Sequence, residues 1–504
     1  MSAPLLVGDW PAHGARHGEH RVAVQDTAAR LSYADLEERS TLLADRLRAA
    51  GLGRGDRLAT VTANSVDHVV AFFGCAKAGL VLVPLSWRAG TTELAALLED
   101  ARPALVATDT ASRTAVHAAA ALLDDPPPAV RLGAGGLEAE LPDLRSRAAG
   151  AAGPAMLDDP VLLLYSSGST GTPKGILLSH ANCWWTNRSL HGRIAMSSED
   201  VVLVVLPQFH VAAWNVQPLL GWLTGARVVV EPAFDPETVL ARVAQERVTM
   251  TMGVPTSYQM LAERPGFAST DLSSLRLALV GGAPIAERVL SAWAARGVPL
   301  VAGYGLTEAG PNVLCQAEQG GDMLPYPGVE VALRDPVTGQ PAEGDRGELV
   351  VRGPNVFAGY WGRPGETARA LAGGWLATGD IAERGPDRGY RLVGRSTAMY
   401  ISGGENVYPG EVEQALLRDA DVAAAAVVGV PDERWGEVGI AFVVARQGLT
   451  LDPEQVRAGV RQHLAGFKVP SRVVVVDALP LTGSGKIDRP ALRGELGNRE
   501  GDGR

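Results

Sequence analysis

The chain has few cysteines, no excess of positive charge and no long apolar run. Its three cysteines lie far apart without C-x-x-C spacing, which argues against a disulfide framework or a zinc site and favours a reducing compartment. The net charge of −10 argues against a general binder of nucleic acid or anionic membranes. Apolar runs such as Val201–Leu206 are too short to span a bilayer, and the N-terminus lacks a signal-peptide pattern. We therefore expect a cytoplasmic protein with no nucleic-acid partner and no integral membrane segment.

The order of apolar segments predicts an α/β fold. Strand and helix signals alternate along the first third of the chain and again over residues 201–302, which predicts mostly parallel sheets covered by helices. Residues 66–78 have the pattern of a helix. Ser32 and Asp35 have the spacing of a capping box, which predicts that a helix begins there.

Other parts of the 504 residues have a different pattern. Residues 112–155 are rich in Ala, Pro and Gly and are interpreted as variable surface structure. From about 328 to 394, short strands and turns predict a small β-rich subdomain. From about 398 onward, helices and strands predict a compact α+β domain of roughly a hundred residues. The expected fold class is α/β, with a large N-terminal part of mixed α/β sheets, this subdomain and a small C-terminal domain.

The most informative segment is residues 165–175, between two apolar runs. It holds three glycines, five Ser or Thr hydroxyls and Lys174. Glycine lets successive backbone N–H groups point at one anion, and the lysine adds charge, so the loop is suited to a polyphosphate. The Walker A pattern is not met, because Gly175 stands where its Ser or Thr would be and the next residues indicate a strand. A Gly/Ser surface turn is the alternative.

Four further glycine-containing segments accompany this loop. They are Gly303-Tyr304-Gly305-Leu306-Thr307-Glu308, Thr378-Gly379-Asp380, Gly394-Arg395 and Gly483-Ser484-Gly485-Lys486. Each alone is more often a turn than a site. Together, in this order and over nearly the whole chain, they resemble the adenylate-forming superfamily of acyl- and aryl-CoA synthetases, luciferases and peptide-synthetase adenylation domains. The resemblance is closest to the fatty-acyl and aryl-CoA synthetases.

This resemblance implies an acid–thiol ligase that uses ATP, Mg²⁺ and coenzyme A. Such enzymes attack the α-phosphate of ATP with a carboxylate, release pyrophosphate and hold an acyl-adenylate before they form the CoA thioester. The first step needs charge neutralisation on the phosphates. The resemblance assigns Lys174 to the β- and γ-phosphates, and Thr307 and Glu308 to the α-phosphate and Mg²⁺. It assigns Lys486 to the carboxylate and the α-phosphate, although a solvated C-terminal lysine is the alternative reading.

The resemblance also implies the nucleotide contacts. Tyr304 would stack on adenine, with core packing as the alternative; Asp380 would accept hydrogen bonds from the ribose, and Arg395 would donate to it. The remaining implied contacts are Ser166, Ser167, Gly168, Ser169, Thr170, Gly171, Gly303 and Gly305.

For the domains, the resemblance implies an adenylation domain over 1–394, with its β-rich subdomain at about 328–394, a hinge at 395–398 and a mobile lid over 399–504. Gly403, Gly404 and Glu405 match the segment that lines the pantetheine channel. Ala398 stands where the family carries a charged hinge residue. A small residue can also serve as a hinge. The alternative is that the thioester step is slow or delegated to another protein.

The expected substrate is a hydrophobic, non-amino carboxylic acid. Amino-acid-activating relatives usually carry aspartate where His210 stands, and an ammonium group beside a histidine is unfavourable. His210 is alternatively a core histidine, and Trp214 a core tryptophan. The predicted pocket residues are His210, Trp214, Gly281, Gly282, Ala283 and Pro284.

Three other functions are considered. The first is adenylation only, with the acyl group passed to a separate ligase or carrier protein. The second is a catalytically silent nucleotide-binding regulator, against which the joint presence of Lys174, Glu308, Asp380 and Lys486 argues. The third is luciferase-like oxidation, which light emission or oxygen uptake would reveal.

Overall fold

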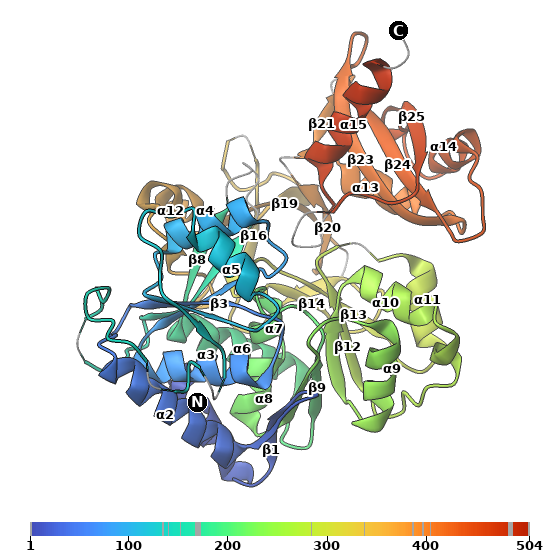
Figure 1. Cartoon of the computed structure of the whole chain (residues 1–504). Coiled ribbons are helices and arrows are strands. Elements are labelled where there is room, and N and C mark those ends of the chain that lie inside the picture. The colour runs from blue at the N-terminus through green and yellow to red at the C-terminus, as the bar shows by residue number, and fades with distance from the viewer. Residues whose placement is uncertain are drawn as a thin grey trace.

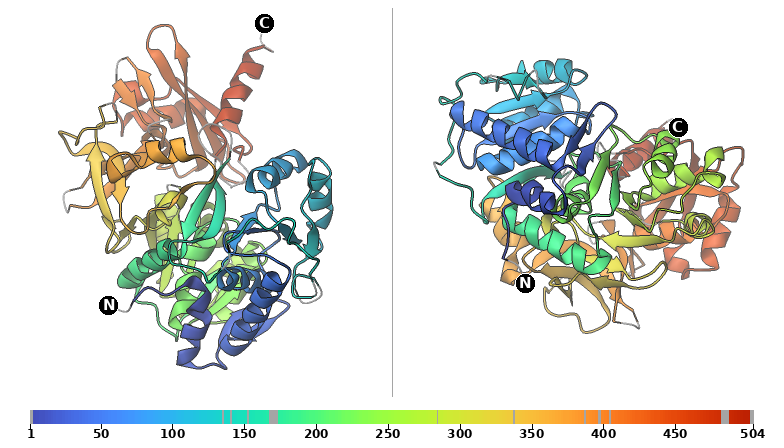
Figure 2. Two further views of the ribbon diagram at one scale, coloured as in Figure 1. Left: turned by 90° about the vertical axis from the view of Figure 1, so that its left-hand side faces the viewer. Right: turned by 90° about the horizontal axis from the view of Figure 1, so that it is seen from below.

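Three β-sheets organise the chain in the computed structural model. The structure describes residues 3–133, 136–139, 141–151, 153–166, 173–283, 285–336, 338–385, 388–395, 398–403, 405–481 and 487–501. Within these ranges the sheets have thirteen, seven and five strands. Residues from β21 onward form a separate upper lobe on the larger body (Figure 1; Figure 2, left). The expected α/β class, with a smaller α+β unit at the C-terminal end, is confirmed.

The seven-stranded sheet has the order β18-β8-β7-β4-β3-β5-β6. Its strands from β7 to β6 run parallel, whereas β8 and β18 are antiparallel additions at one edge. The parallel strands β3, β4 and β5 are almost entirely buried, as expected for a sheet covered on both faces. The strands are β3 (Arg57–Val61), β4 (Val81–Leu85), β5 (Leu105–Thr108), β6 (Ala129–Arg131), β7 (Pro160–Ser166), β8 (Lys174–Ser179) and β18 (Gly359–Tyr360).

The thirteen-stranded sheet has the order β16-β17-β19-β20-β15-β14-β13-β12-β11-β9-β10-β1-β2. Strands β13, β12, β11, β9, β10 and β1 are parallel, and the β-rich segment joins this sheet through antiparallel strands. The strands are β1 (Val22–Gln25), β2 (Arg30–Ser32), β9 (Val201–Val204), β10 (Arg227–Val230), β11 (Met250–Gly253), β12 (Leu277–Gly281), β13 (Leu300–Tyr304), β14 (Leu314–Gln316), β15 (Met323–Pro325), β16 (Glu330–Arg334), β17 (Arg346–Arg352), β19 (Leu376–Arg384) and β20 (Tyr390–Arg395).

Helices cover both larger sheets. The capping box of Ser32 and Asp35 is present, and α2 begins at Tyr33. A second box, of Ser179 and Asn182, begins α6 directly after β8. The helices are α1 (Trp10–Gly14), α2 (Tyr33–Ala49), α3 (Val66–Ala78), α4 (Thr91–Ala101), α5 (Arg113–Ala120), α6 (His180–Ile194), α7 (Ala212–Asn215), α8 (Pro218–Thr224), α9 (Pro236–Gln245), α10 (Pro255–Ala262), α11 (Glu287–Ala294) and α12 (Pro364–Ala370).

The C-terminal lobe is built on the five-stranded sheet. Its strands are β21 (Tyr400–Ser402), β22 (Glu405–Val407), β23 (Val422–Asp432), β24 (Gly436–Ala445) and β25 (Arg472–Val476), and its helices are α13 (Pro409–Leu416), α14 (Pro453–Arg461) and α15 (Arg489–Gly501). Arg288 of α11 joins the lobe to the body, because its guanidinium donates to the carbonyls of Val422 and Ala423 at 2.8 and 3.0 Å. Across the described residues, no helix combines the length and hydropathy needed to cross a bilayer.

Candidate active site

The candidate site begins where β13 ends. Strands β12 and β13 are parallel, so their carboxyl ends meet at one edge, where Gly281 pairs with Gly303. After Tyr304 the chain turns into a short 3-10 helix, Thr307–Ala309, which carries Thr307 and Glu308. Only glycine fits at 305, because a Cβ there would lie 1.3 Å from the carbonyl oxygen of Pro311. The tight turn therefore fixes the position of Glu308 relative to the end of β13.

Tyr304, Asp380 and Arg395 form one hydrogen-bonded group. The Tyr304 hydroxyl donates to Oδ2 of Asp380 at 2.7 Å, and Nε of Arg395 lies 2.9 Å from Oδ1. Asp380 and Arg395 face each other in the register of β19 and β20. Burial, with the Asp380 charge as a smaller cause, raises the pKa of Tyr304 well above its usual value, so the phenol stays neutral and donates.

Lys174 and Glu308 both lie next to Tyr360. The Tyr360 hydroxyl donates to Oε1 of Glu308 at 3.0 Å, and Nζ of Lys174 lies 5.5 Å from the centroid of the same ring. Burial, and then the Glu308 charge, raise the pKa of Tyr360, so this phenol is also a donor. Ser166 faces Lys174 across the β7–β8 pair.

In this structure the Lys174 ammonium is paired with a carboxylate of α12. Its Nζ lies 2.5 Å from Oε2 of Glu366, and the hydrogen bond from Lys174 lowers the pKa of that carboxyl group. Figure 1 shows α12 close to β8. A phosphate that approaches Lys174 therefore competes with Glu366 for the same ammonium group.

Backbone contacts hold the turn that carries Glu308. The Phe357 N–H donates to the Glu308 carbonyl at 2.8 Å. The buried Asn355 donates its side-chain amide to the Ala309 carbonyl at 2.7 Å. Neither Asn355, Tyr360 nor Glu366 was predicted from the sequence. A polar residue within the otherwise apolar run before Gly359 was the only available signal for Asn355.

The acyl-pocket candidates that the structure describes lie near the ends of β9 and β12. Gly282 directly follows β12 and has a φ of +89°, which favours glycine. The rings of Phe209 and His210 lie 4.4 Å apart. Ala283 is exposed. Trp214 is fully buried, stacks on Phe72 at 4.6 Å and donates Nε1–H to the Gln208 carbonyl, so the structure gives its ring a packing position in the core.

The C-terminal candidates make their described contacts within the lobe. Gly403 has a φ of +61°, and its N–H donates to the Trp435 carbonyl at 2.8 Å. Glu405 pairs with Ser402 across the β21–β22 hairpin. Ala398 is half-buried in the connection between β20 and β21. The predicted residues Ser167, Gly168, Ser169, Thr170, Gly171, Pro284, Gly404 and Lys486 lie outside the described residues.

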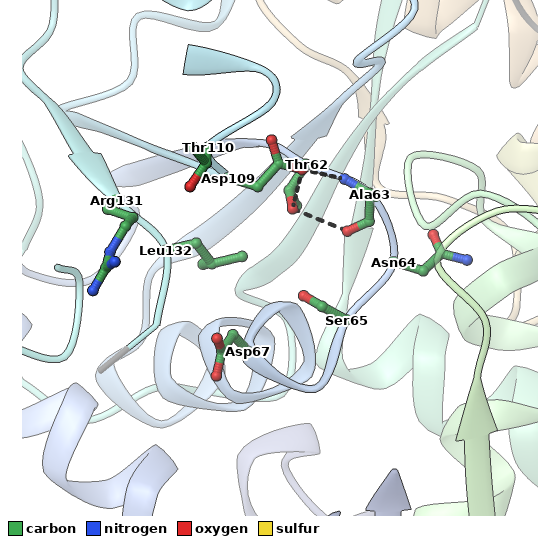
Figure 3. A pocket seen from close by; sticks show the side chains of 9 residues that line it. All are labelled: Thr62, Ala63, Asn64, Ser65, Asp67, Asp109, Thr110, Arg131 and Leu132. Carbon is green, nitrogen blue, oxygen red and sulfur yellow. Dashed lines mark hydrogen bonds between the residues drawn. The ribbon is translucent and has the colours of Figure 1, made fainter. Parts of the chain in front are cut away.

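A separate cavity of about 380 Å³ opens at the carboxyl ends of β3 and β5. Figure 3 shows Asp67, Asp109, Thr110 and Arg131 around it. Both carboxylates already have partners: Asp109 accepts from the N–H groups of Ala63 and Ser112, and Asp67 pairs with Arg39. None of the residues that line this cavity is predicted from the sequence to bind ATP.

Known proteins match this chain over nearly its whole length. The family model described as AMP-binding enzyme matches residues 11–361, and the one described as AMP-binding enzyme C-terminal domain matches residues 411–486. A feruloyl-CoA synthase of Amycolatopsis sp is 44% identical, over 98% of this chain and 99% of that protein. An indoleacetate–CoA ligase of Aromatoleum aromaticum is 35% identical, over 97% and 98%. The crystal structure of the anthranilate CoA ligase AuaEII with anthranoyl-AMP has a TM-score of 0.89 at 25% identity, over 98% of each chain.

Proposed function

Since the chain belongs to the AMP-binding enzyme family, we propose that it is an AMP-forming acid–CoA ligase that activates an aromatic carboxylic acid. ATP and the acid give an acyl-adenylate and pyrophosphate, and coenzyme A then displaces AMP to give the thioester. The observation that carries the proposal is that Lys174 and Glu308 both lie next to Tyr360, one at its ring and the other at its hydroxyl. It offers one cation for phosphate and one carboxylate for a metal ion within a single cluster.

The residues fit Mg²⁺ together with a nucleotide. Among the described residues, no group of three or more His, Cys, Asp and Glu side chains forms a metal cage. Mg²⁺ is usually held by one or two carboxylates plus substrate phosphates, and Glu308 supplies such a carboxylate. When bound, Mg²⁺ neutralises charge on the phosphates. Lys174 binds the β- and γ-phosphates, and Thr307 offers a hydroxyl donor beside Glu308.

Tyr304, Asp380 and Arg395 are proposed to hold the nucleoside. Asp380 keeps its carboxylate in place through Tyr304 and Arg395, and a carboxylate has about four acceptor positions, so the ribose hydroxyls can still donate to it. The Tyr304 ring, held by its hydroxyl and next to the glycines at 303 and 305, would stack on adenine.

Lys486 is proposed as the catalytic lysine of adenylation. It would neutralise the charge that builds between the substrate carboxylate and the α-phosphate. The lobe that carries it would turn about Ala398 for the second half-reaction, in which Gly403, Gly404 and Glu405 would line the thiol channel. This part of the proposal depends on the family pattern around these residues.

The proposed substrate is a planar aromatic acid. The three relatives named above act, by their names, on ferulate, indoleacetate and anthranilate. The consecutive glycines at 281 and 282 put no side chain into the predicted pocket, and a Cβ at 282 would come no closer than 3.8 Å to Val254, which favours a flat ring there. His210 in place of an aspartate disfavours an α-amino acid. A cytoplasmic setting is part of the proposal, because all three cysteines are free thiols.

The test is pyrophosphate release from a panel of acids, with and without CoA. The panel contains hydroxycinnamic and arylacetic acids, straight-chain fatty acids and α-amino acids. We expect release with an aromatic acid, a thioester when CoA is present, and at least a roughly 100-fold loss in Lys486→Ala. Lys77→Ala, on α3 and paired with Glu37, is the control and should keep its activity. Acyl-AMP that accumulates without any gain from CoA would favour transfer to a separate ligase or carrier protein instead.

A further inference from the structure

We propose that Tyr360 is a positioning residue. It orients the Glu308 carboxylate toward the metal ion and positions the Lys174 ammonium for the phosphates. The inference rests on the proposed function of Lys174 and Glu308. It adds a residue that none of the glycine-rich segments contains, from a strand only two residues long.

The backbone of Tyr360 is fixed on both sides. Strand β18 pairs with β8, and Tyr360 faces Ile176, two residues beyond Lys174. The Tyr360 N–H donates to Oγ1 of Thr367 at 2.9 Å. Gly359 has a φ of +145°, and a Cβ there would lie 2.8 Å from Cγ2 of Thr367. The phenol is therefore carried by rigid backbone and is tied directly to the strand that carries Lys174.

The hydroxyl of Tyr360 fixes one half of the Glu308 carboxylate. It donates to Oε1 at 3.0 Å, whereas none of the described residues forms a hydrogen bond with Oε2. One oxygen is therefore held while the other is left for a ligand. Hydrogen bonds to a carboxylate that binds a metal ion orient it, and their loss typically costs 10–100-fold in metal affinity or activity.

The ring of Tyr360 performs a different task. The Lys174 ammonium lies 5.5 Å from its centroid, within the range of a cation–π contact, and the ring also packs on Phe357 at 4.8 Å. When Lys174 leaves Glu366 for a phosphate, the ring still offers it a face. The hydroxyl and the ring thus act on two charges of opposite sign, and substitutions can separate them.

The backbone of the Glu308 turn does not depend on Tyr360. Asn355 binds the Ala309 carbonyl and Phe357 binds the Glu308 carbonyl. Removal of the hydroxyl should therefore free the carboxylate without moving the turn. This property makes Tyr360→Phe a specific probe, whereas Tyr360→Leu removes both contacts.

The experiment titrates Mg²⁺ in two assays. One is pyrophosphate release with the best acid of the panel, and the other is calorimetric binding of ATP with Mg²⁺ or with a chelator. For Tyr360→Phe we expect the Mg²⁺ concentration at half-maximal rate to rise roughly 10-fold or more. The affinity for ATP in the presence of the chelator should stay within about 2-fold of that of the unmodified protein. Tyr360→Leu should also weaken the binding of ATP in the presence of the chelator.

Tyr33→Phe is the matched control, because it removes a tyrosine hydroxyl that donates to the carbonyls of Gly221 and Ala226 outside the site. Its Mg²⁺ requirement should be unchanged. An active protein whose Tyr360→Phe variant responds to Mg²⁺ like the unmodified chain overturns the role of Tyr360. If the unmodified chain activates none of the acids and binds no ATP, the proposed function fails instead. Should Tyr360→Leu not fold, Tyr360→Phe alone decides.

Discussion

At the scale of single residues, each described charged side chain that the sequence singles out for the phosphates and the metal ion has a side-chain partner in the fold. Lys174 and Glu308 are recognisable because each stands in a glycine-containing segment with a known chemistry. Their partners, Glu366 and Tyr360, stand in ordinary surroundings, and each lies more than fifty residues away in the sequence. Side-chain partners so distant leave no local pattern. They therefore became visible only in the fold.

The Glu366 carboxylate should act as a competitor of ATP. It holds the Lys174 ammonium at 2.5 Å, and phosphate binding must break this pair. We expect Glu366→Gln to strengthen ATP binding, by up to about 5-fold, because an ion pair near the surface contributes little to the binding energy that ATP must overcome. The gain should shrink as salt is added. Calorimetric titration of ATP at low and high ionic strength measures both effects.

A suitable control is Glu454→Gln, which removes the same charge from an ion pair with Arg457 on α14. It should leave ATP binding unchanged at both salt concentrations. An equal gain in both variants would mean that net charge, and not the release of Lys174, is responsible. A weaker affinity in Glu366→Gln would mean that Glu366 orients Lys174 for the phosphates.

At the scale of elements, sequence patterns predicted well what depends on neighbouring residues. The helix expected over residues 66–78 is α3, with the same bounds, because Ser65 caps its start and Gly79 ends it. Residues 112–155, interpreted as variable surface structure, also contain α5 and β6. The two-residue β18 was not predicted, since only its pairing with β8 makes it a strand.

The turn after β13 provides a prediction about glycine. A Cβ at 305 would lie 1.3 Å from the Pro311 carbonyl oxygen, so Gly305→Ala must move the turn that carries Thr307 and Glu308. We expect at least a roughly 100-fold loss of pyrophosphate release, because displacements near 1 Å can cost that much. Initial rates at saturating ATP and acid, on protein shown to be folded by circular dichroism, measure the loss.

Gly459→Ala, in α14, is the control for Gly305→Ala. A Cβ there meets no atom within 4 Å, and alanine favours a helix over glycine. It should raise the unfolding free energy by roughly 0.5–1 kcal/mol and leave the rate unchanged. A Gly305→Ala variant that retained full activity would show that the turn can shift without disturbing Glu308.

At the scale of the whole molecule, the two large sheets share one apolar core, and the C-terminal lobe has apolar clusters of its own. The cores of the sheets follow from apolar strand runs, which the sequence displays. Isolated polar groups add specific contacts between the units. Arg288 of α11 donates to carbonyls of β23, and the amide of Asn64 donates to the carbonyls of Leu206 and Glu231. Their partners lie more than 130 residues away, so the arrangement of the units was not predictable from local pattern.

Two buried histidines should make the stability of the whole body depend on pH. His180 accepts a hydrogen bond from the Val7 N–H, and His68 lies against Thr60 and Trp214. Burial lowers the pKa of each imidazole to about 4 in the folded state. The unfolded chain, with a pKa near 6.5, binds these protons first, so stability is complete above about pH 6.5 and falls as the pH drops toward 4.

Each histidine accounts for up to about 3 kcal/mol of this loss, from 1.36 kcal/mol per unit of pKa difference. Urea unfolding at pH values from 4 to 7.5 measures it, in a window above that of aspartates such as Asp200, whose pKa is lowered. His68→Gln and His180→Asn keep an acceptor near the original nitrogen but cannot take up the proton, so each should flatten the slope. His20→Gln, at a side chain that is 89% exposed, should not. A slope that survives both buried substitutions would locate the acid sensitivity in other groups, because the two imidazoles would then contribute nothing to it.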